Sequence, residues 1–165
     1  MLALLLSVLI LGNIGLDQSA DLSELSQLRL RDQYGSEDSL AAHRGQVVVV
    51  MVVTAKRLRN IKPWERDLRG RFETIVYLRI ADVPEDPPAT YDGVAQKLVE
   101  RVPEGVSVLI DLDRRWATTL GLDTSRPNIL VIDSDGKLVS AHQGRHDPEL
   151  AAQVLEGIGA VVGSP

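Results

Sequence analysis

The sequence predicts an α/β protein: a three-layer α/β/α sandwich with a mixed sheet, ending in a C-terminal β-hairpin and a terminal helix. Two observations predict this class. From residue 28 onward, strand-like apolar runs alternate with helix-like runs, an order that gives parallel strands joined by right-handed crossovers. The last two strand-like runs are separated only by the turn Ser134-Asp135-Gly136, so they form an antiparallel hairpin at the sheet edge.

The strongest strand signal lies in residues 46–54, which contain an unbroken, mostly β-branched run. Such a run is typical of a central strand buried on both faces. Residues 60–72 carry apolar side chains at spacings of three and four, which predicts an amphipathic helix. Pro63 falls in the first turn of this helix, where proline is tolerated.

The remaining elements continue the alternation. Further strands are predicted at residues 74–80, 106–112, 128–132 and 137–142. Further helices are predicted at residues 91–102, 114–120 and 147–161. Three prolines make residues 83–90 a loop. In the last helix Asp147 is the expected N-cap and Pro148 the first helical residue.

The composition excludes several function classes. The chain has 165 residues and a mass of 18.0 kDa, which fits one domain. Its formal net charge of −5 argues against general nucleic-acid binding. It contains no cysteine, so it has no disulfide, no thiolate metal site and no nucleophilic thiol.

The N-terminal segment is strongly apolar. Residues 1–11 suit the central region of a signal peptide, although no basic residue precedes them and no clean cleavage site follows. We expect residues 1–20 to be a signal peptide or N-terminal hydrophobic anchor of an exported, periplasmic or cell-surface protein, and residues 21–163 to form the domain. Contact with a membrane is expected only through this segment, if it is not cleaved. The alternative is a cytoplasmic protein whose N-terminal helix packs on the domain.

Two stretches resemble the redoxin branch of the thioredoxin fold, the peroxiredoxin and TlpA-type proteins. They are LRDQYGSEDSLAAHRGQVVVV, which begins at Leu30, and LIDLDRRWATTLGLDTSRPNILVIDSDGKLVSAHQG, which begins at Leu109. The resemblance covers about residues 28–158 and implies a thioredoxin-like mixed sheet. It also implies that Pro127 is the structural cis-proline of that fold.

The chain departs from that family where its chemistry is carried. The family has Cys-x-x-Cys at a helix N-terminus after the central strand, and these two positions correspond to Leu58 and Ile61. Neither side chain supplies the thiolate that the family's reaction needs. We therefore expect a redox-inactive protein: no thiol–disulfide oxidoreductase or peroxidase, and no cofactor.

The segment around those positions is basic. Seven cations stand against Glu65 and Asp67, a local charge of +5 that leaves −10 for the remainder. The cations are Lys56, Arg57, Arg59, Lys62, Arg66, Arg69 and Arg71. They suggest that the former active-site face binds an acidic protein partner. The alternative is an ordinary solvated helix face.

The expected contact surface has an apolar centre and a cationic rim. Leu58 and Ile61 form the centre, and Pro127 lies beside it. The other contact residues are Lys56, Arg57, Arg59, Lys62 and Trp64.

Two further sets of polar residues have mainly structural interpretations. His142 and His146 match no zinc spacing and are expected to be surface residues, so no metal site is expected. Asp113 suits a helix N-cap, and Asp133 and Asp135 suit a hairpin turn.

Asp111 has no such explanation. It supports an alternative function, a non-thiol and metal-assisted enzyme. A third interpretation is a purely structural domain of a larger assembly.

Overall fold

The computed structural model describes residues 22–162, so the leader or anchor expected at residues 1–20 lies outside the described residues. The strands are β1 (Leu30–Asp32), β2 (Glu37–Asp38), β3 (Val48–Thr54), β4 (Val76–Asp82), β5 (Leu109–Asp111), β6 (Asn128–Ile132) and β7 (Leu138–Gln143). The α-helices are α1 (Ser23–Gln27), α2 (Lys62–Arg71), α3 (Tyr91–Arg101), α4 (Arg115–Leu120) and α5 (Pro148–Val162). Two 3₁₀ helices, η1 (Leu40–His43) and η2 (Ala55–Ile61), complete the described chain. Within residues 22–162 no helix is both long and apolar enough to cross a membrane.

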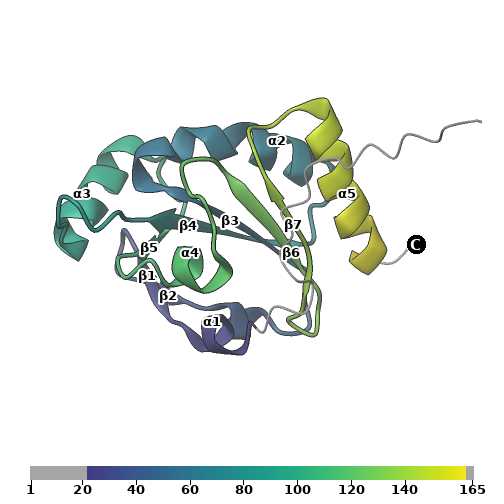
Figure 1. Ribbon diagram of the computed structural model, residues 1–165, viewed down its shortest axis with the longest axis horizontal. Coiled ribbons are helices and arrows are strands. Elements are labelled where there is room, and N and C mark those ends of the chain that lie inside the picture. The colour runs from purple at the N-terminus through teal and green to yellow at the C-terminus, as the bar shows by residue number, and fades with distance from the viewer. Residues whose placement is uncertain (1–21, 163–165) are drawn as a thin grey trace, which may run out of the picture.

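The strands form one mixed sheet in the order β2-β1-β5-β4-β3-β6-β7 (Figure 1). The central strands β5, β4 and β3 are parallel, as expected for strands joined through helices. The β6–β7 hairpin joins β3 in the antiparallel sense, which confirms the predicted hairpin edge. A second short hairpin, β1–β2, closes the opposite edge through β5.

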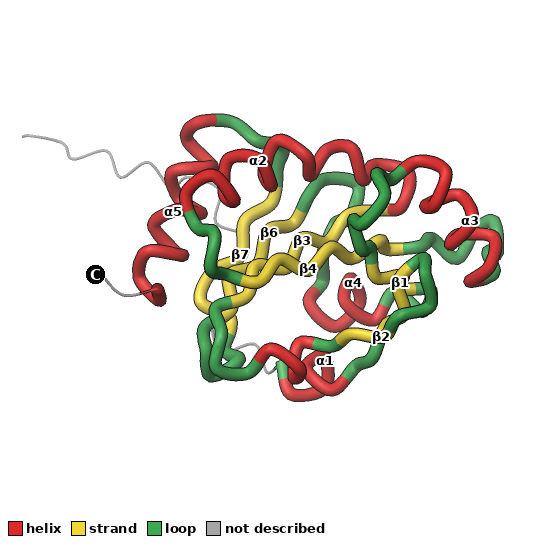
Figure 2. The backbone as a smooth tube through the Cα atoms, turned by 180° about the vertical axis from the view of Figure 1, so that it is seen from behind, coloured by secondary structure: helices red, strands yellow, loops and turns green. Residues whose placement is uncertain are grey.

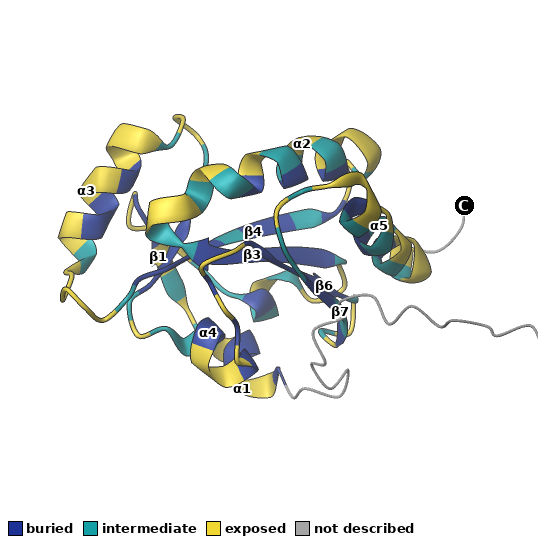
Figure 3. Ribbon diagram, turned by 45° about the horizontal axis from the view of Figure 1, so that its top comes forward, coloured by how far each residue is buried: buried dark blue, intermediate teal, exposed yellow. Residues whose placement is uncertain are grey.

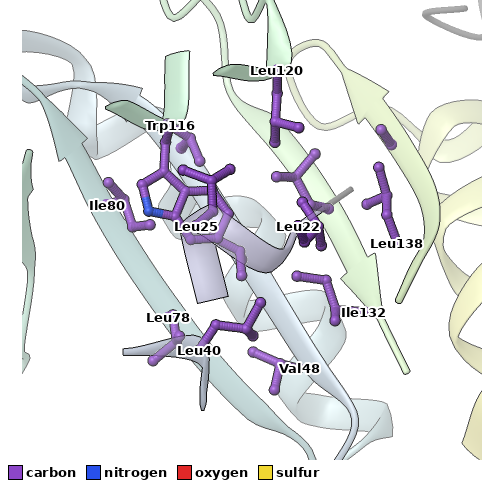
Figure 4. Close-up of a cluster of buried hydrophobic side chains, with 14 of the residues drawn as sticks. Leu22, Leu25, Leu40, Val48, Leu78, Ile80, Trp116, Leu120, Ile132 and Leu138 are labelled. Carbon is purple, nitrogen blue, oxygen red and sulfur yellow. The ribbon is translucent and has the colours of Figure 1, made fainter. Parts of the chain in front are cut away.

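Helices cover both faces of this sheet and make three layers (Figure 2). One face packs against α1, η1 and α4 and buries an aliphatic cluster around Trp116 (Figure 4). The other face packs against α2 and α5, and further along against α3. The strands β3 and β4 are buried between the layers, whereas the outer sides of α2 and α3 are exposed (Figure 3). The predicted sandwich with its terminal helix is therefore confirmed.

The structure differs from the expected elements mainly beside the central strands. The helix predicted to begin at residue 60 begins at Lys62, and η2, which the pattern did not predict, connects it to β3. Strand β4 runs two residues beyond the predicted end, to Asp82. It does so because parallel pairing with β3 and β5 continues to the end, where Asp82 is in register with Thr54 and Asp111.

Candidate functional site

Leu58 and Ile61, the two positions expected to correspond to the family's cysteines, lie in η2, directly after the central strand. Ile61 is only 2% exposed and packs in the cluster beneath α2 and α5. Leu58 is half-buried and packs against two core clusters. The expectation that both form the exposed apolar centre of an interface is therefore wrong for Ile61, because its side chain faces the sheet. Only Leu58 offers accessible apolar surface.

Trp64 is not a partner contact. Its side chain is fully buried, and its indole Nε1 donates to the Gly144 carbonyl oxygen at 3.3 Å. The His146 ring meets it edge-on at a centroid distance of 4.9 Å. Trp64 lies one helical turn before Leu68, so both face the core, and the assignment of Trp64 to the contact surface is wrong.

The bond before Pro127 is also not cis. Among residues 22–162 the cis peptide bond is Asp86–Pro87, so the expectation for Pro127 is wrong. Trans is the ordinary state of an X–Pro bond, and hydrogen bonds hold the loop around it. The amide of Asn128 donates to the Arg126 carbonyl at 3.0 Å, and the Gly144 N–H donates to the Pro127 carbonyl at 2.9 Å. Pro127 is buried and offers no contact surface.

The predicted basic segment separates into two groups. Three of its arginines have local partners. Arg57 Nη1 donates to the Ser125 carbonyl at 2.8 Å, and the Arg69 guanidinium lies 4.3 Å from the centre of the Tyr77 ring. Arg71 forms an ion pair with Asp67, which lies one turn earlier in α2.

The other four cations, Lys56, Arg59, Lys62 and Arg66, line a cleft of about 840 Å³ between η2–α2 and α3. Arg79 of β4 and Arg101 of α3 line it as well, so six cations face one carboxylate, Glu65. We call this the basic cleft. Its other lining residues are Ala55, Leu58, Ile61, Pro63, Leu98, Val102, Pro103, Val106 and Val108.

The single carboxylate of the basic cleft is already paired. Arg79 and Glu65 form an ion pair, and their side chains are 12% and 16% exposed. Arg79 also donates to the Ser107 carbonyl. Burial lowers the pKa of the Arg79 guanidinium, an effect that the charge of Glu65 opposes. The side chains of the five exposed cations make no ion pair or hydrogen bond with any described residue, so no ion pair within residues 22–162 neutralises their charge.

Arg79 and Arg101 are the site residues that the sequence reasoning missed. Tyr77, Arg79 and Ala81 alternate along β4 and point to the face that carries α2 and α3. An arginine within the apolar run TIVYLRI was the available signal, because a charge in a buried strand needs a partner. Arg101 had no local signal, since only the fold brings the end of α3 beside η2.

Asp111 has a structural role that the sequence did not reveal. Its carboxylate accepts the backbone N–H groups of Arg115 and Trp116 at 3.0 and 2.9 Å, so it caps α4. Burial raises its pKa, and these two hydrogen bonds oppose the rise. The expected cap, Asp113, is exposed and does not make these bonds. Asp133 does stabilise the hairpin turn, accepting from the N–H groups of Asp135 and Lys137.

The two C-terminal histidines differ from each other. His146 is half-buried and contacts the Asp67 carboxylate at 3.0 Å. His142 is only 4% exposed, and neither ring nitrogen has a hydrogen-bond partner among the described residues. The expectation of two surface histidines is therefore wrong for His142, which lies opposite Ile129 on the face covered by α2 and α5. Within residues 22–162 no three His, Asp or Glu side chains come together as a metal site.

Folding stability is expected to fall with acidity because of His142. Burial lowers its pKa below the ordinary value of 6.5, so below that pH the unfolded chain binds more protons than the folded chain. The contribution of His142 to the free energy of unfolding is therefore fully present above about pH 6.5. It is lost as the pH falls, by at most about 1.4 kcal/mol per pH unit. Urea unfolding at about pH 7.5 and pH 5.5 measures this effect. The His142→Leu variant should lose less stability between these two conditions than the wild type, and an equal loss would contradict the prediction.

Comparison with known proteins gives matches only among solved structures. No protein-family model matches the chain, and no curated protein sequence matches it. The pneumococcal exposed lipoprotein thioredoxin of Streptococcus pneumoniae has a TM-score of 0.64 at 18% identity, over 78% of this chain and 97% of that chain. A secreted disulfide oxidoreductase of Mycobacterium tuberculosis has a TM-score of 0.58 at 16% identity, over 83% of this chain and 98% of that chain. Peroxiredoxin Q of Xanthomonas campestris has a TM-score of 0.59 at 12% identity, over 84% of this chain and 94% of that chain.

The chain therefore has a thioredoxin-like fold, and its structural neighbours are thioredoxin-like redoxins. It contains no cysteine, so it carries none of the thiol chemistry named in those proteins' descriptions.

Proposed function

We propose that this protein is a redox-inactive, thioredoxin-like binding protein whose basic cleft takes an acidic segment of a protein partner. The observation that carries the proposal is the set of five exposed cations around one cleft. They are Lys56, Arg59, Lys62, Arg66 and Arg101, and the one carboxylate in the lining already pairs with Arg79.

This arrangement supports binding for an electrostatic reason. Like charges held close together repel one another, and an acidic partner would relieve that repulsion on binding. Residues 56–71 carry +5 and the rest of the chain carries −10, so the positive charge beside the cleft would orient a negatively charged partner during approach. Three of the five cations, Lys56, Arg59 and Lys62, belong to the contact surface expected from the sequence.

The test uses a fluorescently labelled polyglutamate peptide and anisotropy titrations. Wild-type protein should bind it at about 0.02 M salt and at least tenfold more weakly at about 0.3 M, because salt screens exposed charges. Replacing Lys56, Arg59, Lys62 and Arg66 by serine should weaken binding by about tenfold or more at low salt.

The matched control removes the same charge elsewhere. Arg44, Lys97, Lys137 and Arg145 are exposed and lie outside the lining of the basic cleft. Their replacement by serine lowers the net charge equally. If both fourfold variants weaken binding to the same extent, the interaction depends on overall charge and the proposed site is rejected.

We also propose that the protein is exported. The support is the apolar segment at residues 1–11, together with structural neighbours described as an exposed lipoprotein and a secreted oxidoreductase. Cell fractionation of the full chain with a C-terminal tag tests this proposal. Recovery only from the cytoplasmic fraction would reject it.

A further inference from the structure

The basic cleft is lined by apolar surface as well as by charge. Leu58, Val102 and Val106 are half-buried and line it. The buried side chains of Leu98 and Val108 lie among the same lining residues. A surface meant only for carboxylates would gain nothing from these aliphatic groups, because carboxylates prefer water or polar partners.

The size of the cleft suits an inserted group rather than a flat contact. Its volume of about 840 Å³ lies within the range of cavities that enclose ligands, roughly 300–1,000 Å³. The chain's own side chains leave this space unfilled in the described structure.

The cations stand on both sides of the apolar surface. Lys56 and Arg59 lie on η2, Lys62 and Arg66 lie on α2, and Arg101 lies across the cleft on α3. A ligand with an apolar group between two carboxylates could place the apolar group against Val102 and pair its carboxylates with both sides. Arg79 is already neutralised by Glu65, so the exposed cations are the ones that remain for a ligand.

We infer that the acidic segment inserts an aliphatic or aromatic side chain into the basic cleft, with acidic residues on either side of it. This inference rests on the proposed function and names the chemistry of its partner. Exposed ion pairs contribute little affinity individually, whereas an apolar side chain buried in a pocket contributes much more. The inserted group thus supplies affinity, and the surrounding cations select an acidic sequence.

The probes are two synthetic peptides of equal length and charge. Both consist of glutamates with one central residue, which is leucine in the first peptide and alanine in the second. Wild-type protein should bind the leucine peptide about tenfold more tightly, because leucine buries additional methylene groups in the cleft. In methyl NMR spectra of the wild type, the leucine peptide should shift the signals of Leu58, Val102 and Val106 more than the alanine peptide does.

Two variants, one on α3 and one at the residue that follows it, separate filling of the cleft from a general effect of an added tryptophan. Val102 lines the cleft, whereas Val99 is 50% exposed and lies outside its lining. The Val102→Trp variant should bind both peptides with equal affinity, and that affinity should match the one that the wild type has for the alanine peptide. The Val99→Trp variant should keep the preference for leucine. Thermal unfolding of both variants shows whether they are folded, and the wild-type NMR titration does not depend on either.

The possible results separate a failure of this inference from a failure of the proposed function. Equal binding of both peptides by the wild type, without methyl shifts at the cleft, overturns this inference and leaves the proposed function standing. Failure of both peptides to bind at low salt overturns both. A leucine preference that survives in Val102→Trp shows that the apolar group is bound elsewhere and also overturns the inference.

Discussion

Replacing Trp64 by alanine is expected to lower the free energy of unfolding by about 3–5 kcal/mol, the usual range for removing a buried aromatic side chain. Trp64 is fully buried between α2 and the sheet, in contact with the cluster that contains Met51, Leu68 and Ile129. The substitution also removes its hydrogen bond to Gly144 and its contact with the His146 ring. Urea unfolding measures the loss.

A Trp64→Phe variant is the control, because phenylalanine fills most of the space but donates no hydrogen bond. It should lose clearly less stability than the alanine variant. Binding of polyglutamate by folded Trp64→Phe protein should match that of the wild type. A specific loss of binding, with stability preserved, would return Trp64 to the contact surface and contradict its assignment to the core.

Replacing Asp82 by alanine is expected to cost about 2–3 kcal/mol of unfolding free energy, because it leaves the buried Thr124 hydroxyl without its acceptor and Arg114 without its ion pair. Asp82 is fully buried at the end of β4. It pairs with Arg114 Nε at 3.2 Å and accepts from the Thr124 hydroxyl at 2.5 Å. Arg114 is about one-third exposed, so water compensates part of the lost ion pair, and the expected cost is below that of a fully buried pair.

The partner of Asp82 in this ion pair has an unusual backbone conformation. Arg114 precedes α4 with a φ of 55°, in the left-handed region that non-glycine residues rarely adopt. An Asp82→Asn variant keeps the shape of the side chain and an acceptor for Thr124, but removes the charge. It should lose less stability than the alanine variant. If alanine costs under about 0.5 kcal/mol, the range of an ordinary surface substitution, the proposed role of the pair is wrong.

Much of the fold could be predicted because its signals are local. The spacing of Trp64 and Leu68, the unbroken run of β3, and the proline and aspartate at the start of α5 depend only on neighbouring residues. The antiparallel hairpin edge then followed from the short turn between the last two strands, whereas the order of the strands within the sheet comes from the structure. Tight turns were also accessible, since Asp133 stabilises the β6–β7 turn through bonds within four residues.

The site was predictable only in part because it is assembled from distant segments. The basic run predicted cations at η2 and α2, but not which of them have partners; Arg57 is held by Ser125 and Arg69 by Tyr77. The comparison with the family's cysteine positions led to the expectation that Leu58 and Ile61 are both exposed, whereas Leu58 is half-buried and Ile61 is buried against the sheet. The order of residues along the chain does not show that Ile61 turns inward. Arg79 had a local signal as a charge within an apolar strand, whereas only the fold could reveal that Arg101 of α3 lies at the same cleft.

The basic cleft is built from separate parts of the chain: η2 and α2, strand β4, and the end of α3 with the loop that follows it. A bound ligand would hold these parts together and would have little affinity for the unfolded chain, where they are apart. Binding therefore raises the melting temperature, by an amount that grows with ligand concentration relative to the dissociation constant. A thermal-shift survey of acidic peptides with varied central residues could thus rank candidate ligands without any assay of activity.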